Sequence, residues 1–126
     1  MFAAQFSNSA GTSAVFAGLN GSANNALLGA VATIVSGACT FDALYVAGTI
    51  TANAASDTLT VTLVKNGSAT ALSTSITVST LNTTVSSSDT TIGHSFAVVA
   101  GDSIAIEVTQ TSGTPTVRLS ITSHCQ

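Results

Sequence analysis

The segment from residue 57 to residue 68 reads Asp-Thr-Leu-Thr-Val-Thr-Leu-Val-Lys-Asn-Gly-Ser and decides the fold class. Its apolar residues Leu59, Val61 and Leu63 alternate with threonines. A period of two residues is that of a β-strand with one face buried and the other in contact with water or a partner. The segment therefore predicts a strand of a layered β-structure, with the three apolar side chains in the core.

The end of the same segment predicts a tight turn. Asn-Gly readily adopts the positive φ angles of a type I′ turn, so Asn66 and Gly67 are expected at the tip of a β-hairpin. A turn centred there places Val61 opposite Leu72. The alternation then continues through Ile76 in the returning strand.

The same alternation recurs along most of the chain, at the spacing typical of β-sandwiches and barrels. Gly101 and Asp102 are expected in a second turn between two such strands. Further strands are predicted over residues 31–35, 39–50, 95–98, 104–109 and 117–121, while residues 82–91 form either an edge strand or a loop. The predicted fold is all-β: a single jelly-roll-like β-sandwich of about eight short antiparallel strands.

The beginning of the chain carries a weaker pattern. Residues 14–17 form a short apolar group among glycine, asparagine and serine, and no proline-rich linker follows. We expect residues 1–25 to form an extended N-terminal arm that orders against a neighbour. Residues 26–126 are expected to form the sandwich domain.

The last two strands allow two arrangements. A hairpin between them would bring Glu107 opposite Arg118, an attractive cross-strand ion pair in a chain with few charges. In a jelly roll the two strands belong to different sheets, and these residues lie apart. We favour the jelly roll, because Pro115 lacks the amide proton that a tight pairing near the turn would need.

The chain is unusually poor in charge. Only 6% of its 126 residues are Asp, Glu, Lys or Arg, whereas about 25% is usual. The sequence holds 18 serines and 21 threonines instead. We expect a surface lined by hydroxyl groups, or covered in good part by other subunits. With Lys65 and Arg118 as its whole basic content, the chain is not expected to bind nucleic acid or a membrane surface.

The sequence shows no targeting or membrane segment. The longest apolar run, residues 26–35, is about half the length of a membrane-spanning helix. The first six residues lack the basic and long apolar regions of a signal peptide. We therefore expect synthesis in the host cytoplasm. Together with a hydroxyl-rich exterior, this is typical of a virion component released by lysis, and a mature secreted chain with an added Met is the alternative.

The two cysteines leave alternatives open. Cys39 and Cys125 are interpreted first as two unpaired, partly buried thiols, and second as a disulfide that ties the end of the chain to the sandwich. His94 and His124 complete no known ligand pattern, so no metal and no cofactor is expected.

No arrangement of residues predicts catalysis. The five acids, Asp42, Asp57, Asp89, Asp102 and Glu107, are scattered singly, and no Gly-x-Ser-x-Gly elbow presents a nucleophile. Asp57 and Asp102 are expected to accept hydrogen bonds from local backbone amides. We therefore expect no enzyme activity.

Sugar-binding β-sandwiches usually present Trp or Tyr side chains as a platform. This chain has no Trp and a single tyrosine, Tyr45, which lies in the middle of a predicted strand and is interpreted as a core or interface residue. Glycan binding therefore ranks behind a structural role.

Two parts of the sequence resemble known families. Residues 40–46, Thr-Phe-Asp-Ala-Leu-Tyr-Val, and residues 60–67, Thr-Val-Thr-Leu-Val-Lys-Asn-Gly, resemble small β-sandwich proteins of virions from phages and metagenomes. Residues 98–108, with Gly101-Asp102, are similar to a segment of C1q/TNF-like jelly rolls. The resemblance implies a jelly roll that assembles as a trimer, and it supplies no catalytic residues.

These expectations lead to one hypothesis and two alternatives. The chain is expected to be a capsid decoration (cement) protein of a phage. As a homotrimer on the capsid surface, it would contact its own copies and the major capsid protein. The alternatives are a receptor- or glycan-binding head of a phage fibre and the subunit of an extracellular filament.

Overall fold

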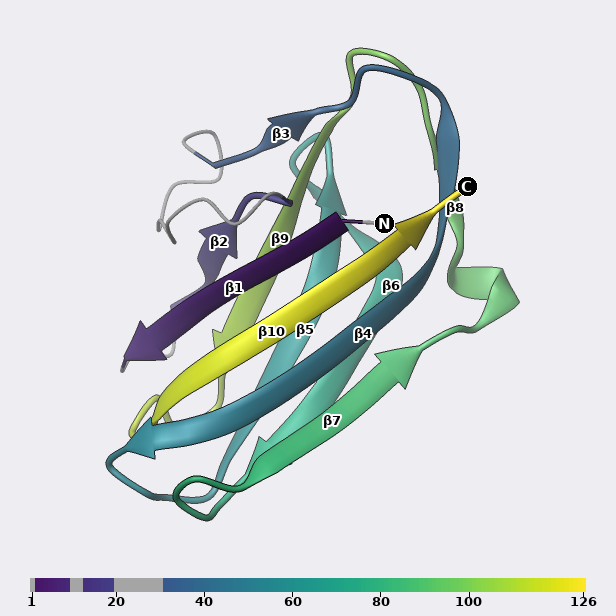
Figure 1. Ribbon diagram of the computed structural model, residues 1–126. Helices are drawn as coiled ribbons and strands as arrows, with labels where there is room; N and C mark the ends of the chain where they lie inside the picture. The colour runs from purple at the N-terminus through teal and green to yellow at the C-terminus, as the bar shows by residue number, and fades with distance from the viewer. Residues whose placement is uncertain (1, 10–12, 20–30) are drawn as a thin grey trace.

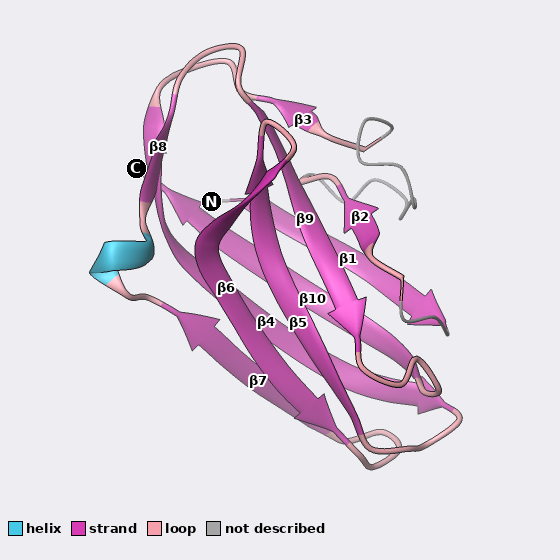
Figure 2. Cartoon of the chain, turned by 180° about the vertical axis from the view of Figure 1, so that it is seen from behind, coloured by secondary structure: helices cyan, strands magenta, loops and turns pink. Residues whose placement is uncertain are grey.

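The chain forms two antiparallel sheets packed face to face. This computed structural model describes residues 2–9, 13–19 and 31–126. Sheet A contains β1 (Phe2–Ser9), β10 (Thr116–Cys125), β4 (Cys39–Ala52), β7 (Thr84–Asp89) and β8 (Phe96–Val98). Sheet B contains β2 (Val15–Ala17), β3 (Thr33–Ile34), β9 (Ser103–Gln110), β5 (Asp57–Lys65) and β6 (Ser68–Val78). Sheet A lies in front in Figure 1 and sheet B in Figure 2.

The order of the strands is that of a jelly roll. β2 and β3 both pair with β9, and β7 and β8 both pair with β4, so each pair acts as one interrupted strand. Counted this way, the sheets have the orders β1-β10-β4-β7/β8 and β2/β3-β9-β5-β6. Two such four-stranded sheets make a jelly roll. The predicted all-β sandwich is confirmed.

The possible ion pair between Glu107 and Arg118 does not form, because the chain has the favoured jelly-roll arrangement and not the alternative hairpin. Glu107 lies in sheet B opposite Thr62, and Arg118 lies in sheet A opposite Thr49. The chain crosses between the sheets after β9, and Gly113 takes a positive φ of 65° in this connection. Consecutive strands in different sheets cannot make cross-strand pairs.

The hairpin of β5 and β6 turns where predicted but has a different register. Asn66 and Gly67 have φ angles of 49° and 83°, as a type I′ turn requires. Val61 faces Thr74 rather than Leu72, because extra residues of β6 bulge out opposite Leu63. A shift by an even number of residues leaves each side chain on its face of the sheet, so Leu72 stays in the core.

The predicted N-terminal arm is in part incorporated into the sandwich. Residues 2–9 pair with β10 along their whole length, and residues 15–17 pair with β9. These pairings give partners to backbone groups that β10 and β9 would otherwise leave open at the sheet edges. The prediction of an arm over residues 1–25 is therefore wrong for residues 2–9 and 15–17, which form strands of the sandwich. Residues 1, 10–12 and 20–25 lie outside the part of the chain that the structure describes.

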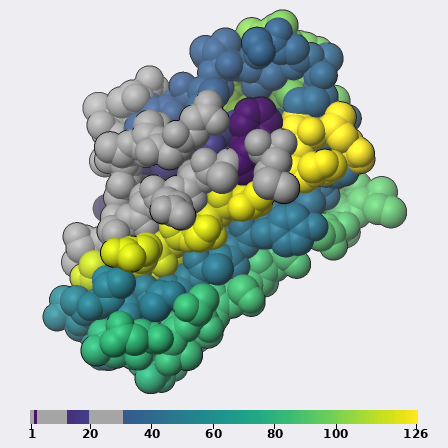
Figure 3. Space-filling model, viewed as in Figure 1, coloured from purple at the N-terminus to yellow at the C-terminus, as the bar shows by residue number. Residues whose placement is uncertain are grey.

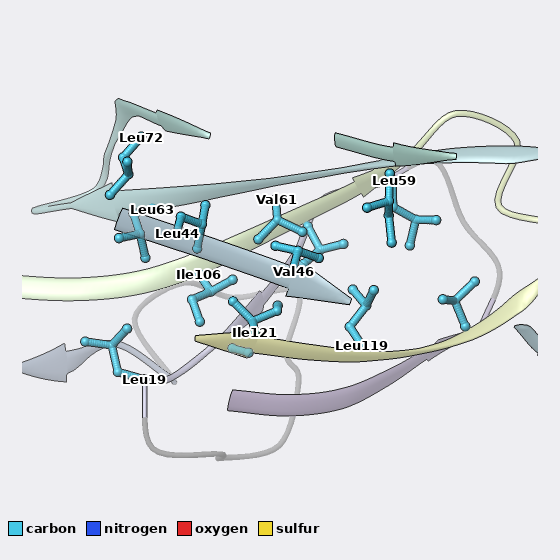
Figure 4. Packing of buried hydrophobic residues seen from close by; sticks show 14 of the residues in the cluster. Leu19, Leu44, Val46, Leu59, Val61, Leu63, Leu72, Ile106, Leu119 and Ile121 are labelled. Atoms are coloured by element: carbon cyan, nitrogen blue, oxygen red, sulfur yellow. The ribbon is translucent and has the colours of Figure 1, made fainter. Parts of the chain in front are cut away.

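The core lies between the two sheets. Leu59, Val61 and Leu63 of β5 are fully buried, as predicted, and they face Leu119 and Ile121 of β10 across the interior (Figure 4). β4 runs through Gly48 without interruption. The side chains of Ile76 and Leu119 occupy the space that a Cβ atom would need there. Among the described residues, no helix is long and apolar enough to cross a membrane.

Candidate functional site

Among the side chains that the structure describes, the outer face of sheet A carries one exposed aromatic, which lies between two short side chains. Tyr45 of β4 is 48% exposed, and Ala43 and Ala47 precede and follow it on the same strand. Its neighbours in the adjacent strands are Thr122 of β10 and Ser88 of β7. Figure 3 looks onto this face, where β10, β4 and β7 lie side by side. Of the two interpretations that the sequence left open for Tyr45, a core or an interface residue, the exposure excludes the first.

Two open hollows meet at Tyr45. The first, which we call the serine hollow, has a volume of about 400 Å³ and lies over Ala47, lined by Ser86, Ser88, Ser120 and Thr122 among others. The second, the carboxylate hollow, has a volume of about 470 Å³ and lies over Ala43, lined by Asp42, Ile92, His124 and Gln126 among others. Both volumes fall within the range of small-ligand sites in proteins.

The carboxylate hollow arises from two irregularities of the sheet. Phe41 pairs with Cys125 and Ala43 with His124, so Asp42 is an extra residue in β4, a β-bulge. On the other side of β4, the pairing with β7 ends at Asp89 and the pairing with β8 begins at Phe96. The 3₁₀ turn η2 (Ile92–His94) lies between these two strands. The hollow opens where β4 has lost a neighbouring strand (η2 is the cyan turn in Figure 2).

The bulge also reverses the phase of β4. In an uninterrupted strand, Phe41, Ala43 and Tyr45 would all point to one face. Because one residue is inserted at Asp42, Phe41 points into the core while Tyr45 is exposed on the outer face. A single inserted residue therefore places the tyrosine and the carboxylate on the same exposed surface.

Two side chains hold the carboxylate of Asp42. Nδ1 of His124 lies 2.7 Å from Oδ1, and Nε2 of Gln126 donates to Oδ2 over 2.6 Å. The side chains of Asp42 and His124 are 28% and 44% exposed, so both are open to a ligand. A neutral imidazole that donates from Nδ1 keeps Nε2 as a hydrogen-bond acceptor.

A disulfide and a backbone pair fix this end of the sheet. Cys39 and Cys125 form a disulfide, with Cα atoms 5.7 Å apart, so the structure has the second of the two states that the sequence left open. The amide of Thr40 donates to the carbonyl of Gln126 over 2.7 Å, and the amide of Gln126 donates back over 3.1 Å. His124 and Gln126 are thus held in place beside Asp42.

A second carboxylate–imidazole pair has a structural role. Asp89 is buried at the end of β7 and accepts hydrogen bonds from Nδ1 of His94 at 2.7 Å and from the amides of Ser73 and Thr91 at 3.1 Å. Burial alone would raise the pKa of Asp89, but these hydrogen bonds outweigh it and lower the pKa to about 2. Asp89 links the edge strands β6 and β7, which belong to different sheets.

Asp57 accepts hydrogen bonds from a loop far along the chain. The amides of Ser112 and Gly113 donate to Asp57 over 2.8 and 3.0 Å, as does Nε2 of Gln110 over 3.0 Å. Burial opposes ionisation, but these bonds prevail and lower the pKa of Asp57. The expected acceptor role is present, but its partners are distant rather than local.

Asp102 stabilises the second predicted turn. Its carboxylate accepts a hydrogen bond from the amide of Val99 over 2.9 Å, and Gly101 takes a positive φ of 96°. The side-chain amide of Asn66, the amide of Val99 and the ammonium of Lys65 together lower the pKa of Asp102 to about 2. The turns at Asn66-Gly67 and Gly101-Asp102 are thereby joined to each other.

No metal site is formed in the part of the chain that the structure describes, since no three His, Cys, Asp or Glu residues gather there. Sequence reasoning missed the pairing of Asp42 with His124, which are 82 residues apart, and no local signal could have revealed it.

Comparisons with known proteins place the chain in no family. No family model matches the sequence, and no curated protein matches it. One solved structure that is similar is described as an EclA C-terminal domain, a sugar-binding protein. The similarity covers 98% of this chain and 76% of that one, with 12% identity and a TM-score of 0.43.

Proposed function

We propose that the chain is a non-catalytic, glycan-binding head domain of the kind carried by virion fibres, and that it binds carbohydrate on the outer face of sheet A. The observation that carries the proposal is the exposure of Tyr45 where two polar hollows meet. The sequence had ranked this function second, because it placed Tyr45 in the core or an interface.

The chemistry of the surface suits a sugar. A tyrosine offers an apolar ring face and a polar edge, which match the C–H and O–H faces of a pyranose. The serine and threonine hydroxyls around it can both donate and accept, and Asp42 is a strong acceptor. No bond needs to be made or broken at such a site, so binding alone is proposed.

A glycan panel tests the proposal. The purified protein is expected to bind some members, and Tyr45→Ala is expected to reduce that binding about tenfold or more, as the loss of an interface aromatic typically does. Ser56→Ala is the control, because Ser56 is exposed in the connection between β4 and β5 and lines neither hollow. A folded protein that binds no glycan on a broad panel would contradict the proposal.

A capsid decoration protein remains the second candidate, and the outer face of sheet B favours it. There Thr58, Thr60 and Thr62 lie within 3.1, 2.8 and 2.8 Å of a hydroxyl of β6. Hydroxyl groups that already hydrogen-bond each other lose little free energy when a binding partner excludes water from them. Such a face is suited to contact between the copies of a homotrimer, the proposed assembly for either candidate.

Copy number separates the two candidates. A decoration protein is expected in hundreds of copies on each particle, bound to the major capsid protein, and a fibre head in few. Quantitative mass spectrometry of intact particles, with the mass of the free protein measured in solution, gives both the copy number and the oligomeric state. Hundreds of copies per particle would favour decoration over the fibre head.

A further inference from the structure

We infer that the ligand is an oligosaccharide without acidic groups, whose sugar units occupy the carboxylate hollow and the serine hollow, on the two sides of Tyr45. This inference rests on the proposed glycan-binding function and adds the charge class and the length of the ligand. It follows from the charges around the site, from the spacing along β4 and from the hydrogen bonds of Asp42.

The charges around the carboxylate hollow disfavour an acidic ligand. The chain has only two fixed cations. Lys65 is held by Asp102 at 3.0 Å and donates to the carbonyl of Ala97, in contact with neither hollow. Arg118 lies opposite Thr49, two residues beyond Ser120 and Ala47 of the serine hollow, and lines neither hollow itself, so the constraint on ligand charge concerns the carboxylate hollow.

An acidic sugar would therefore meet repulsion in the carboxylate hollow. The carboxylate that lines this hollow belongs to Asp42. The imidazole of His124 faces it and is hydrogen-bonded to it. Even with a protonated imidazole the pair has no net positive charge. A carboxylate or sulfate on the ligand would thus lose its hydrating water molecules without forming an ion pair in return.

The spacing of the site favours a chain of sugars over a single one. Ala43, Tyr45 and Ala47 follow one another at intervals of two residues along β4. At about 3.3 Å per residue, the floors of the two hollows lie about 13 Å apart, farther than one sugar ring reaches. A single unit can contact Tyr45 from one hollow, whereas only an oligosaccharide can fill both.

Asp42 is a prepared acceptor for sugar hydroxyls. Each carboxylate oxygen already accepts one hydrogen bond, from His124 or from Gln126, and each retains capacity for another. The two existing bonds, together with the disulfide next to His124, fix the orientation of the carboxylate before a ligand arrives. A fixed acceptor loses less conformational freedom on binding.

The experiment compares matched ligands by isothermal titration. Uncharged tetrasaccharides that bind in the glycan panel are set against the same chains bearing a carboxylate or sulfate, and against their monosaccharides. The uncharged tetrasaccharide is expected to bind about tenfold or more tightly than either, because the acidic chain is repelled and the monosaccharide fills one hollow.

Three variants locate the ligand. Asp42→Asn is expected to weaken tetrasaccharide binding about tenfold, and Ser56→Ala to leave it unchanged. Ala47→Leu, which fills the serine hollow, is expected to weaken the tetrasaccharide but not the monosaccharide. Thermal unfolding of each variant verifies that it is folded, and Ala47→Leu keeps the test valid if Asp42→Asn is unstable.

Some outcomes overturn this inference and leave the proposed function intact. They are equal or tighter binding of the acidic chain, a monosaccharide that binds as tightly as the tetrasaccharide, or Asp42→Asn and Ala47→Leu without effect. Absence of binding to any glycan would instead remove the proposed function itself.

Discussion

Asp89 shows how one carboxylate can join two sheets. It sits at the end of β7 in sheet A, yet it accepts the amide of Ser73 from β6 in sheet B. Its ionised form receives further hydrogen bonds from His94 and Thr91. Because these bonds form only in the folded chain, the ionisation of Asp89 is coupled to folding.

Acid is therefore expected to destabilise the protein. The pKa of Asp89 is about 2 in the folded state and ordinarily 3.8, so its contribution is present above pH 3.8 and is lost as the pH falls towards 2. The shift corresponds to about 2 kcal/mol. The pKa values of Asp57 and Asp102 are also lowered, and their ionisation acts in the same direction.

Urea unfolding at pH 7 and pH 2 measures this effect. The free energy of unfolding of the wild type should fall more between these pH values than that of Asp89→Asn, which has no charge to lose. An equal fall in both proteins would assign the acid sensitivity to other groups.

Gly48 offers a second prediction for a single residue. An alanine there would bring its Cβ atom into the side chains of Ile76 and Leu119. Gly48→Ala is expected to lower the free energy of unfolding by about 1–3 kcal/mol, the usual effect of overpacking a core. Gly37→Ala is the control, because nothing lies within 4 Å of its Cβ position. Equal stability of the two variants, measured in urea, would contradict the packing argument.

At the scale of the element, the alternation of residues predicts most strands correctly, but not the irregularities that build the site. The pattern in β5 puts Leu59, Val61 and Leu63 in the core, because the period of a strand is fixed by its backbone. Nothing in the pattern of β4 predicts an extra residue at Asp42. The bulge depends on the pairing with β10, which lies more than 70 residues later.

The turn between β5 and β6 supplies a test at this scale. Gly67 has a φ of 83°, a conformation that costs other L-residues about 1–2 kcal/mol. Gly67→Ala should lower the unfolding free energy by about that amount. Gly93→Ala should have little effect, because nothing lies within 4 Å of its Cβ position and its φ is not positive. Denaturant midpoints of both variants decide the matter, and an unchanged Gly67→Ala would refute the argument from φ.

At the scale of the molecule, the disulfide closes most of the chain into one loop. Cys39 and Cys125 are separated by 86 residues, so the bond restricts the unfolded chain strongly. Reduction, or a Cys39→Ala/Cys125→Ala double variant, is expected to cost about 2–5 kcal/mol in stability. It should also weaken glycan binding, because it frees the strand ends that hold His124 and Gln126 beside Asp42.

Thermal unfolding with and without reductant measures the loss of stability on reduction. The double variant, which has no disulfide to reduce, is the control. A transition that does not move on reduction would contradict this prediction.

The topology of the whole molecule was partly within reach of the sequence. The absence of a proton donor at Pro115 favoured the jelly roll over a terminal hairpin, and the strand order confirms it. The places of β1 and β2 were not predictable, because these short segments gain their stability from pairing with β10 and β9. The site was missed for a similar reason: Asp42, Tyr45 and His124 come together only through the folded sheet.

The pairing of β1 with β10 has a consequence for engineering. Phe2 lies directly opposite Ser123, so positions near the two ends of the sequence are cross-strand neighbours (Figure 1). A short linker could join the two ends of the chain, and new ends could be opened in an exposed turn such as Asn66-Gly67. The permuted domain could then be inserted into a surface loop of an unrelated scaffold, because its two new ends would lie next to each other in that turn.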